Sequence, residues 1–181
     1  MNSQQRAEEL FTFSNIQNQK VEFYWKGADY NFTINRLDEV SDDASGNKFF
    51  KLKYNIFSAL QRQTNTVLTF GGAWSNHIYA TASTCKKLGL RSIGIIRGEE
   101  PAHYSETLEH ARKSGMELHF ITREAYKEKN EDYFKAWLRD EFGSVQIIPE
   151  GGSNFLGVQG CMEIPSLFPT ETSEVYMAAG T

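Results

Sequence analysis

The feature that most constrains the fold is a regular alternation of short apolar runs with segments of helical periodicity. The apolar, β-rich runs lie at 66–70, 91–97, 116–121, 144–149 and 174–178. Segments with helical spacing separate them at 49–60, 78–85, 105–114, 123–140 and 155–164. Strands separated by helices of this length predict βαβ units, and therefore an α/β fold around a parallel sheet.

Apolar residues that recur three or four positions apart predict which helix faces turn towards the core. Gly89 is expected to end the second helix. The expected apolar faces are Leu52, Ile56 and Leu60 in the first helix, Ile78, Ala82 and Cys85 in the second, and Tyr133 and Trp137 in the helix at 123–140.

The front of the chain has a different pattern. VEFYW (21–25) and YNFTINR (30–36) predict two strands, with Gly27 and Asp29 in the turn between them. A polar break follows at 42–46, before the first helix. This front segment therefore lies outside the run of βαβ units.

Three loops are the expected places for a ligand. Parallel sheets bind ligands beyond the carboxyl ends of their strands. The segments found there are GGAWSNH (71–77), EGGSN (150–154) and AAGT (178–181), all rich in Gly, Ser, Thr or Asn. Such loops can turn backbone N–H groups towards an anion, although a tight turn explains Gly71-Gly72 equally well.

Composition excludes several classes of protein. A net charge of −4 argues against nucleic-acid binding. The apolar runs are too short to cross a membrane, and the polar start MNSQQRAEEL is unlike a signal peptide. Cys85 and Cys161 lie far apart without a CxxC pair or a His cluster, so neither a disulfide framework nor a metal site is expected. The default location is the cytoplasm.

Three motifs together resemble one family of enzymes. SGNKFFKLKYN (45–55), preceded by RLDE (36–39), is similar to a Gly-Asn-Lys motif that carries a cofactor lysine. TFGGAWSNHIYATA (69–82) resembles a Gly-Gly-x-x-Ser-Asn loop with its helix, and IPEGGSNFLGVQG (148–160) resembles a later Gly-rich segment. In this order they resemble the 1-aminocyclopropane-1-carboxylate deaminase / D-cysteine desulfhydrase family, which depends on pyridoxal phosphate (PLP).

The resemblance implies the type II fold of PLP enzymes, similar to tryptophan synthase β, with the cofactor between two α/β domains. Residues 1–49 would begin the larger domain, 50–150 would form the smaller one, and 151–181 would return to the larger. Family chains continue well beyond a phosphate loop that would begin at Gly180 and Thr181. We therefore expect this chain to be a fragment with an incomplete second domain, which binds PLP weakly.

The lysines after Gly46 are the first candidates for chemistry. The resemblance makes Lys48 the residue that binds the cofactor aldehyde and moves the substrate's Cα proton. A solvated lysine at a helix start is the alternative without the motif. Lys51 lies one turn further and could reach the cofactor phosphate, whereas Lys53 points to another side and is expected to be solvated.

The loop 71–77 supplies the substrate candidates. Ser75 and Asn76 could simply cap a helix. The resemblance implies that Asn76 donates a hydrogen bond to the cofactor's ring oxygen. It implies that Ser75 binds the substrate carboxylate or takes part in proton transfer. His77 is expected beside the substrate and favours a desulfhydrase, although a lone His at a helix start is most often on the surface. Trp74 could wall the pocket or pack in the core.

The remaining candidates have simpler alternatives. Gly151, Gly152 and Ser153 would border the cofactor cleft or form a plain turn, while Gly180 and Thr181 would open the phosphate loop. Arg36 and Asp38 are expected to form an ordinary ion pair at the surface. Cys85, on an apolar helix face, is expected to be inert core.

The leading functional hypothesis is a PLP-dependent lyase that converts D-cysteine to pyruvate, sulfide and ammonia. Its variant is deamination of 1-aminocyclopropane-1-carboxylate. The alternatives are another type II PLP enzyme, a non-catalytic ligand-binding fragment, and an unrelated α/β enzyme for sugar phosphates. The partners implied are a small amino acid and a second copy in a homodimer, with neither nucleic acid nor membrane.

Overall fold

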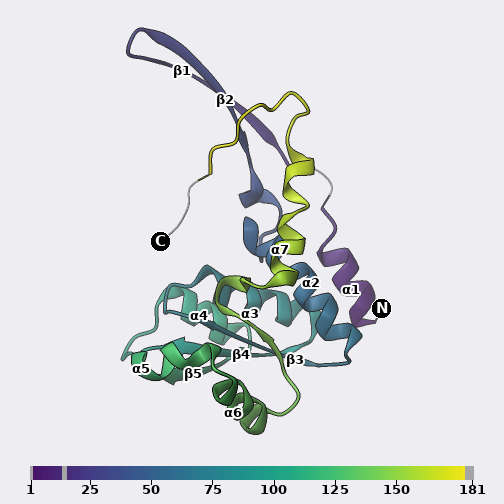
Figure 1. Cartoon of the computed structure of the whole chain (residues 1–181), viewed down its shortest axis with the longest axis vertical. Helices are drawn as coiled ribbons and strands as arrows, with labels where there is room; N and C mark the ends of the chain where they lie inside the picture. Colours follow the sequence, from purple (N-terminus) through teal and green to yellow (C-terminus); the bar gives the residue numbers. More distant parts are fainter. Residues whose placement is uncertain (1, 14–15, 178–181) are drawn as a thin grey trace.

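The fold is a parallel α/β unit from which a β-hairpin projects (Figure 1). The computed structural model describes residues 2–13 and 16–177. Among these residues, no helix is long and apolar enough to cross a membrane. Gly180 and Thr181, with the rest of the expected phosphate loop, lie outside the described residues.

The front elements are helix α1 (Ser3–Leu10) and a hairpin of β1 (Asn18–Trp25) and β2 (Ala28–Asn35). The βαβ series then contains α2 (Asn47–Gln61), β3 (Thr66–Gly71), α3 (Asn76–Leu88), β4 (Arg91–Arg97), α4 (Glu106–Lys113), β5 (Glu117–Ile121), α5 (Arg123–Lys127), α6 (Asp132–Phe142), β6 (Gln146–Ile148) and α7 (Phe155–Cys161). Short 3-10 turns lie at Leu37–Glu39, Glu128–Asn130, Glu150–Gly152 and Ile164–Leu167.

The four-stranded sheet has the order β5-β4-β3-β6, and its strands are parallel. Helices α3 and α4 bury Ile78, Leu108 and Ala111 against one face. Helices α5 and α6 bury Tyr126 and Leu138 against the other. The expected α/β fold around a parallel sheet is therefore confirmed.

A third hydrophobic cluster joins α1, α2 and α3 to Val67 of β3 and Ile148 of β6. Phe49, Phe50 and Phe11 are buried there, with Phe49 and Phe50 packed edge to face at 5.2 Å between ring centroids. Phe49 and Phe50 lie in the first turn of α2, next to Lys48. This core therefore fixes the end of α2 that carries the candidate lysine.

Helix α7 lies directly against α2. A Cβ atom built on Gly160 would sit 1.8 Å from the carbonyl oxygen of Phe50, and one on Gly157 would sit 2.0 Å from that of Gly152. No side chain fits at either position, because real Cβ atoms do not approach so closely. The two glycines let α7 pack against the backbone of α2 and against the loop that precedes α7.

The hairpin turns through Lys26 and Gly27, both with positive φ, which suits a two-residue turn between twisted strands. Asp29 does not belong to the turn as expected; it pairs with Tyr24 inside the ladder. One face of the ribbon carries Val21, Phe23, Trp25, Ala28, Tyr30, Phe32 and Ile34, and the aromatic side chains on it are 43–54% exposed.

Two other expectations were wrong in detail. The helix at 123–140 is broken into α5, a 3-10 turn and α6, because Glu131 has extended backbone. Its face with Tyr133 and Trp137 is exposed, and Phe134 and Leu138 are buried instead. The described part of the last expected strand, residues 174–177, forms no strand.

The uncovered hairpin face leads to a first prediction. Replacing Phe23 and Phe32 together by threonine keeps β-propensity but removes apolar surface, so the fluorescence of a dye that binds exposed apolar patches should fall clearly. The control is Tyr24→Thr, which removes a still more exposed ring from the opposite face. Equal loss of fluorescence in the control would contradict a one-sided patch.

Candidate functional site

The start of α2 presents two lysines towards the loop before α7. Lys48 is half-buried, and its ammonium donates a hydrogen bond to the side-chain oxygen of Asn47 at 3.0 Å. Lys51, one turn further along, has its Nζ 3.5 Å from the hydroxyl of Ser153. The two cations therefore face the same region from one side of the helix.

The environment of Lys48 weakens its hold on a proton. Burial lowers its pKa, and the neighbouring charge of Lys51 lowers it further. Lys53 lies on another side of α2, where its ammonium is 2.8 Å from a carboxylate oxygen of Glu163. Lys53 therefore has a structural partner, and the expectation that it would be solvated was wrong.

His77 is the third group at this place. It is 1% exposed, and neither ring nitrogen has a hydrogen-bond partner among the described residues. Burial, followed by the charges of Lys48 and Lys51, lowers its pKa to about 3, so the ring is neutral. A buried polar ring without partners costs stability, and such groups are common at functional sites. This burial excludes the alternative of a surface histidine.

The loop before α7 lies against Lys51 and His77. Gly152 has a φ of +68°, and a Cβ atom built there would lie 3.0 Å from Cβ of Lys51 and 3.3 Å from Cε1 of His77. This position therefore needs glycine for both its backbone and its space. The loop sits against α2 and α3 at the carboxyl end of β6, the place expected of a ligand site.

Ser75 caps helix α3, and its hydroxyl oxygen accepts a hydrogen bond from the N–H of Ile78 at 3.3 Å. Asn76 is the first residue of the helix and is exposed. Trp74 is 72% exposed, which excludes the alternative of core packing. The first backbone N–H groups of α3 are not needed by the helix and can hold an anion.

The structure thus brings Lys48, Lys51, His77, Gly152 and Ser153 together from α2, α3 and the loop at Glu150–Gly152. Arg36, Asp38 and Cys85 are not part of this group. The guanidinium of Arg36 pairs with the carboxylate of Asp38 at the surface, with a shortest N–O distance of 2.7 Å. Cys85 is fully buried, which raises its pKa to about 12 and makes it inert, as expected.

Sequence reasoning missed one pair of residues at the edge of this group. Asn55, which is fully buried on α2, exchanges side-chain hydrogen bonds with Asn154, the cap of α7. The available signal was a polar residue on the apolar side of a helix, between Leu52 and Ile56. Its partner is 99 positions away, so no local pattern reveals it.

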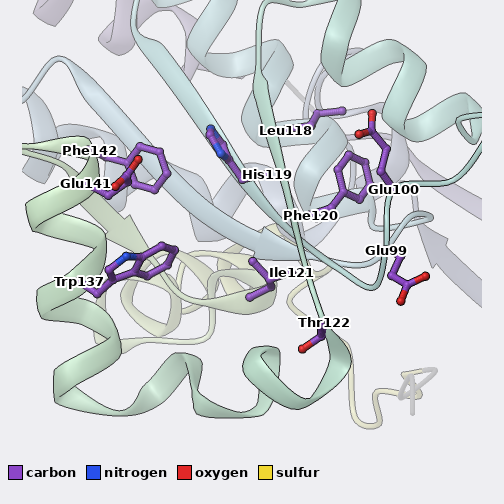
Figure 2. A pocket seen from close by; sticks show the side chains of 10 residues that line it. All are labelled: Glu99, Glu100, Leu118, His119, Phe120, Ile121, Thr122, Trp137, Glu141 and Phe142. Carbon is purple, nitrogen blue, oxygen red and sulfur yellow. The ribbon is translucent and has the colours of Figure 1, made fainter.

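A separate hollow lies apart from these lysines. It has a volume of about 590 Å³ beside β5, the edge strand, and α6. Figure 2 shows Trp137 and Phe142 on one side of β5 and Phe120 with Glu100 on the other. Its lining combines aromatic rings with carboxylates and contains no lysine, so we place the candidate site at Lys48 instead.

Comparison with known proteins connects this geometry to a family, although no family model matches the chain. A putative 1-aminocyclopropane-1-carboxylate deaminase of Thermotoga maritima is 35% identical over 134 residues, which are 72% of this chain and 42% of the relative. A bifunctional D-cysteine desulfhydrase/1-aminocyclopropane-1-carboxylate deaminase of Arabidopsis thaliana, a mitochondrial protein, is 35% identical over 140 residues, 72% of this chain and 35% of the relative.

Solved structures agree in fold. The crystal structure of an ACC deaminase homologue matches 96% of this chain and 55% of its own, with a TM-score of 0.66 and 24% identity. A hydrogen sulfide-producing enzyme from Fusobacterium nucleatum matches 87% of this chain and 46% of its own, with a TM-score of 0.58 and 14% identity. The fold is that of type II PLP enzymes.

The chain spans well under half the length of these two curated relatives. The matched region is nevertheless long enough to decide the relationship, because both relatives match 72% of this chain at 35% identity. The chain belongs to the 1-aminocyclopropane-1-carboxylate deaminase / D-cysteine desulfhydrase family.

Proposed function

We propose that this chain supplies the cofactor lysine and the substrate loop of a PLP-dependent lyase, with Lys48 as that lysine. The observation that carries the proposal is the convergence of the Lys48 amine with Lys51, His77 and Gly152. An amine that reacts with an aldehyde must be unprotonated, and burial beside a second cation favours the unprotonated form.

The residues present fit PLP. Lys51 is a cation whose Nζ contacts a loop hydroxyl at 3.5 Å, an arrangement that suits a phosphate or carboxylate oxygen. The ring nitrogens of His77 are buried and lack partners among the described residues, so a polar ligand would satisfy them. When bound, PLP supplies an aldehyde for the substrate's amino group and a ring that takes up electrons from Cα.

Lys48 is proposed to hold the cofactor and then to move the proton at the substrate's Cα atom. The same lowered pKa serves both tasks, because a neutral amine can attack a carbonyl carbon and can accept a proton. Lys51 adds to the effect of burial in lowering the pKa of Lys48, and its charge attracts the anionic ligand. Lys53 takes no part, because it is held by Glu163.

The loop before α3 is proposed to bind the substrate carboxylate. Ser75 accepts a hydrogen bond from the backbone, which leaves its own O–H free to donate to an anion. The backbone N–H groups at the start of α3 and the helix dipole also attract a carboxylate. Asn76 is exposed beside them and is proposed to contact the cofactor's ring oxygen, with Trp74 at the wall of the substrate pocket.

D-cysteine is the proposed substrate, and 1-aminocyclopropane-1-carboxylate is the second candidate. The buried, neutral ring of His77 favours D-cysteine, because its N–H can donate a hydrogen bond to the leaving sulfur. The names of the relatives cover both reactions. The division of the chain into domain segments 1–49, 50–150 and 151–181 is part of the proposal. It is supported by the hairpin, which forms a sheet of its own, and by the four-stranded sheet, whose strands all come from the middle segment.

The proposal predicts where the cofactor attaches. Borohydride reduction in the presence of PLP should fix the cofactor on Lys48, and peptide mapping by mass spectrometry should find it there. Lys48→Ala should abolish this adduct, whereas Lys53→Ala should retain it. An adduct on another lysine in the unmodified sequence would refute the assignment.

The electrostatic argument predicts a shift with pH. Lys51→Met removes a positive charge that lowers the pKa of Lys48, so that pKa should rise. At any pH below the raised pKa, a smaller fraction of Lys48 would then be the neutral amine. Labelling of Lys48 by an amine reagent should therefore slow. The midpoint of labelling against pH, followed by mass spectrometry, should move upwards. Lys53→Met is the control and should leave it unchanged.

The choice of substrate can be measured directly. In the lyase to which this chain is proposed to contribute, D-cysteine should release sulfide when PLP is present, and His77→Gln should slow that release more than it weakens PLP binding. Ammonia cannot separate the two reactions, since both produce it. Formation of 2-oxobutanoate from the cyclopropane substrate without sulfide from D-cysteine would reverse the order of the candidates.

A further inference from the structure

Two asparagines join α2 to the loop of the candidate site. The Nδ2 of Asn55 donates to Oδ1 of Asn154 at 3.1 Å, and the Nδ2 of Asn154 donates back to Oδ1 of Asn55 at 2.8 Å. Asn55 is fully buried. The two amides therefore form a closed, reciprocal pair inside the protein, which we call the amide clamp.

Backbone groups fix the orientation of both amides. Asn55 also donates to the carbonyl oxygen of Lys51 at 2.8 Å, and Asn154 also accepts from the N–H of Gly157 at 2.8 Å. Turning either amide over would bring donor against donor or acceptor against acceptor. The clamp thus has one arrangement, and it includes the carbonyl of a site lysine.

The position of the clamp relates it to the site. Asn55 lies one helical turn beyond Lys51 and two beyond Lys48. Asn154 directly follows Ser153, which contacts Lys51, and its own N–H donates to the carbonyl of Gly152 at 3.1 Å. A shift of Asn154 would therefore move Gly152 relative to the lysines and to the imidazole ring that it contacts.

We propose that Asn55 and Asn154 are positioning residues, which hold the loop at 150–153 against Lys48 and Lys51 so that Lys48 stays desolvated for reaction with the cofactor. This inference rests on the proposed function for the identity of the cofactor. The geometric part of the inference is independent of the proposed function, because the clamp joins residues of this chain to one another.

A helix cap alone does not explain the pair. Capping α7 needs one acceptor for the N–H of Gly157, and serine or aspartate would serve as well as asparagine. Asn55 has no part in the cap, and its burial is acceptable because its amide hydrogens and its oxygen are satisfied. The distinctive element is the bridge between the amides, which a shorter side chain at 154 cannot make.

The test separates the bridge from the cap. Asn154→Ser keeps an N-cap oxygen but is too short to reach Asn55. Asn2→Ser is the matched control, because Asn2 caps α1 in the same way without a partner on another helix. Glu163→Gln is the second control; it weakens the ion pair with Lys53 between α2 and the end of α7, away from the loop.

Two measurements on the whole chain without PLP decide the matter. In Asn154→Ser, amide hydrogen exchange at 150–153 should accelerate at least about tenfold, and the pH midpoint for labelling Lys48 should move up towards that of an ordinary lysine. Both controls should leave these values unchanged even where they lower the melting temperature.

Each result is decisive. Unchanged exchange and labelling in Asn154→Ser would overturn the proposal, as would equal changes in Glu163→Gln. A third measurement, borohydride trapping of added PLP on Lys48, should become about tenfold less efficient at low PLP concentration. If trapping fails even in the unaltered chain while exchange and labelling respond as expected, the clamp stands and the proposed function falls.

Discussion

The pairing of β6 with β3 holds the candidate site together. It is a short contact, in which Val67, Leu68 and Thr69 are paired with Gln146–Ile148, and the buried hydroxyl of Thr69 adds a bond of 2.8 Å to the carbonyl of Ile148. Because the strands are parallel, both end at the same edge of the sheet. The loops 71–77 and 150–154, far apart in sequence, therefore meet at this edge, and α2 packs beside them.

The charges of the side chains determine which ligands the candidate site can attract. Two lysine side chains and a neutral imidazole face a loop of small residues in a partly desolvated region. The positive charge gathered here costs energy unless an anion joins it, so binding of an anionic ligand would stabilise the arrangement. A phosphorylated or carboxylated ligand would relieve both the repulsion and the unsatisfied ring. The same features that destabilise the site therefore prepare it for its ligand.

Much of this could be predicted from sequence, because it depends on local patterns. The strands β3, β4 and β5 are short apolar runs, and the loops after β3 and β6 contain the expected small residues. The burial of His77 could not be predicted, since it comes from the loop at Gly152 that closes over it. The partnership of Asn55 with Asn154 and the break at Glu131 were missed because each depends on tertiary contacts or on backbone geometry without a clear residue signal.

The order of residues in the amide clamp has a consequence for how the protein is made. Asn55 lies before β3 and Asn154 lies after β6, so the clamp encloses the whole four-stranded sheet in sequence. During synthesis Lys48 emerges early but lacks its surroundings until the last strand has joined β3. Contacts of such wide separation form late and slowly. The reactive environment of the lysine is therefore an end product of folding, and a chain that stalls halfway would carry an ordinary, protonated amine.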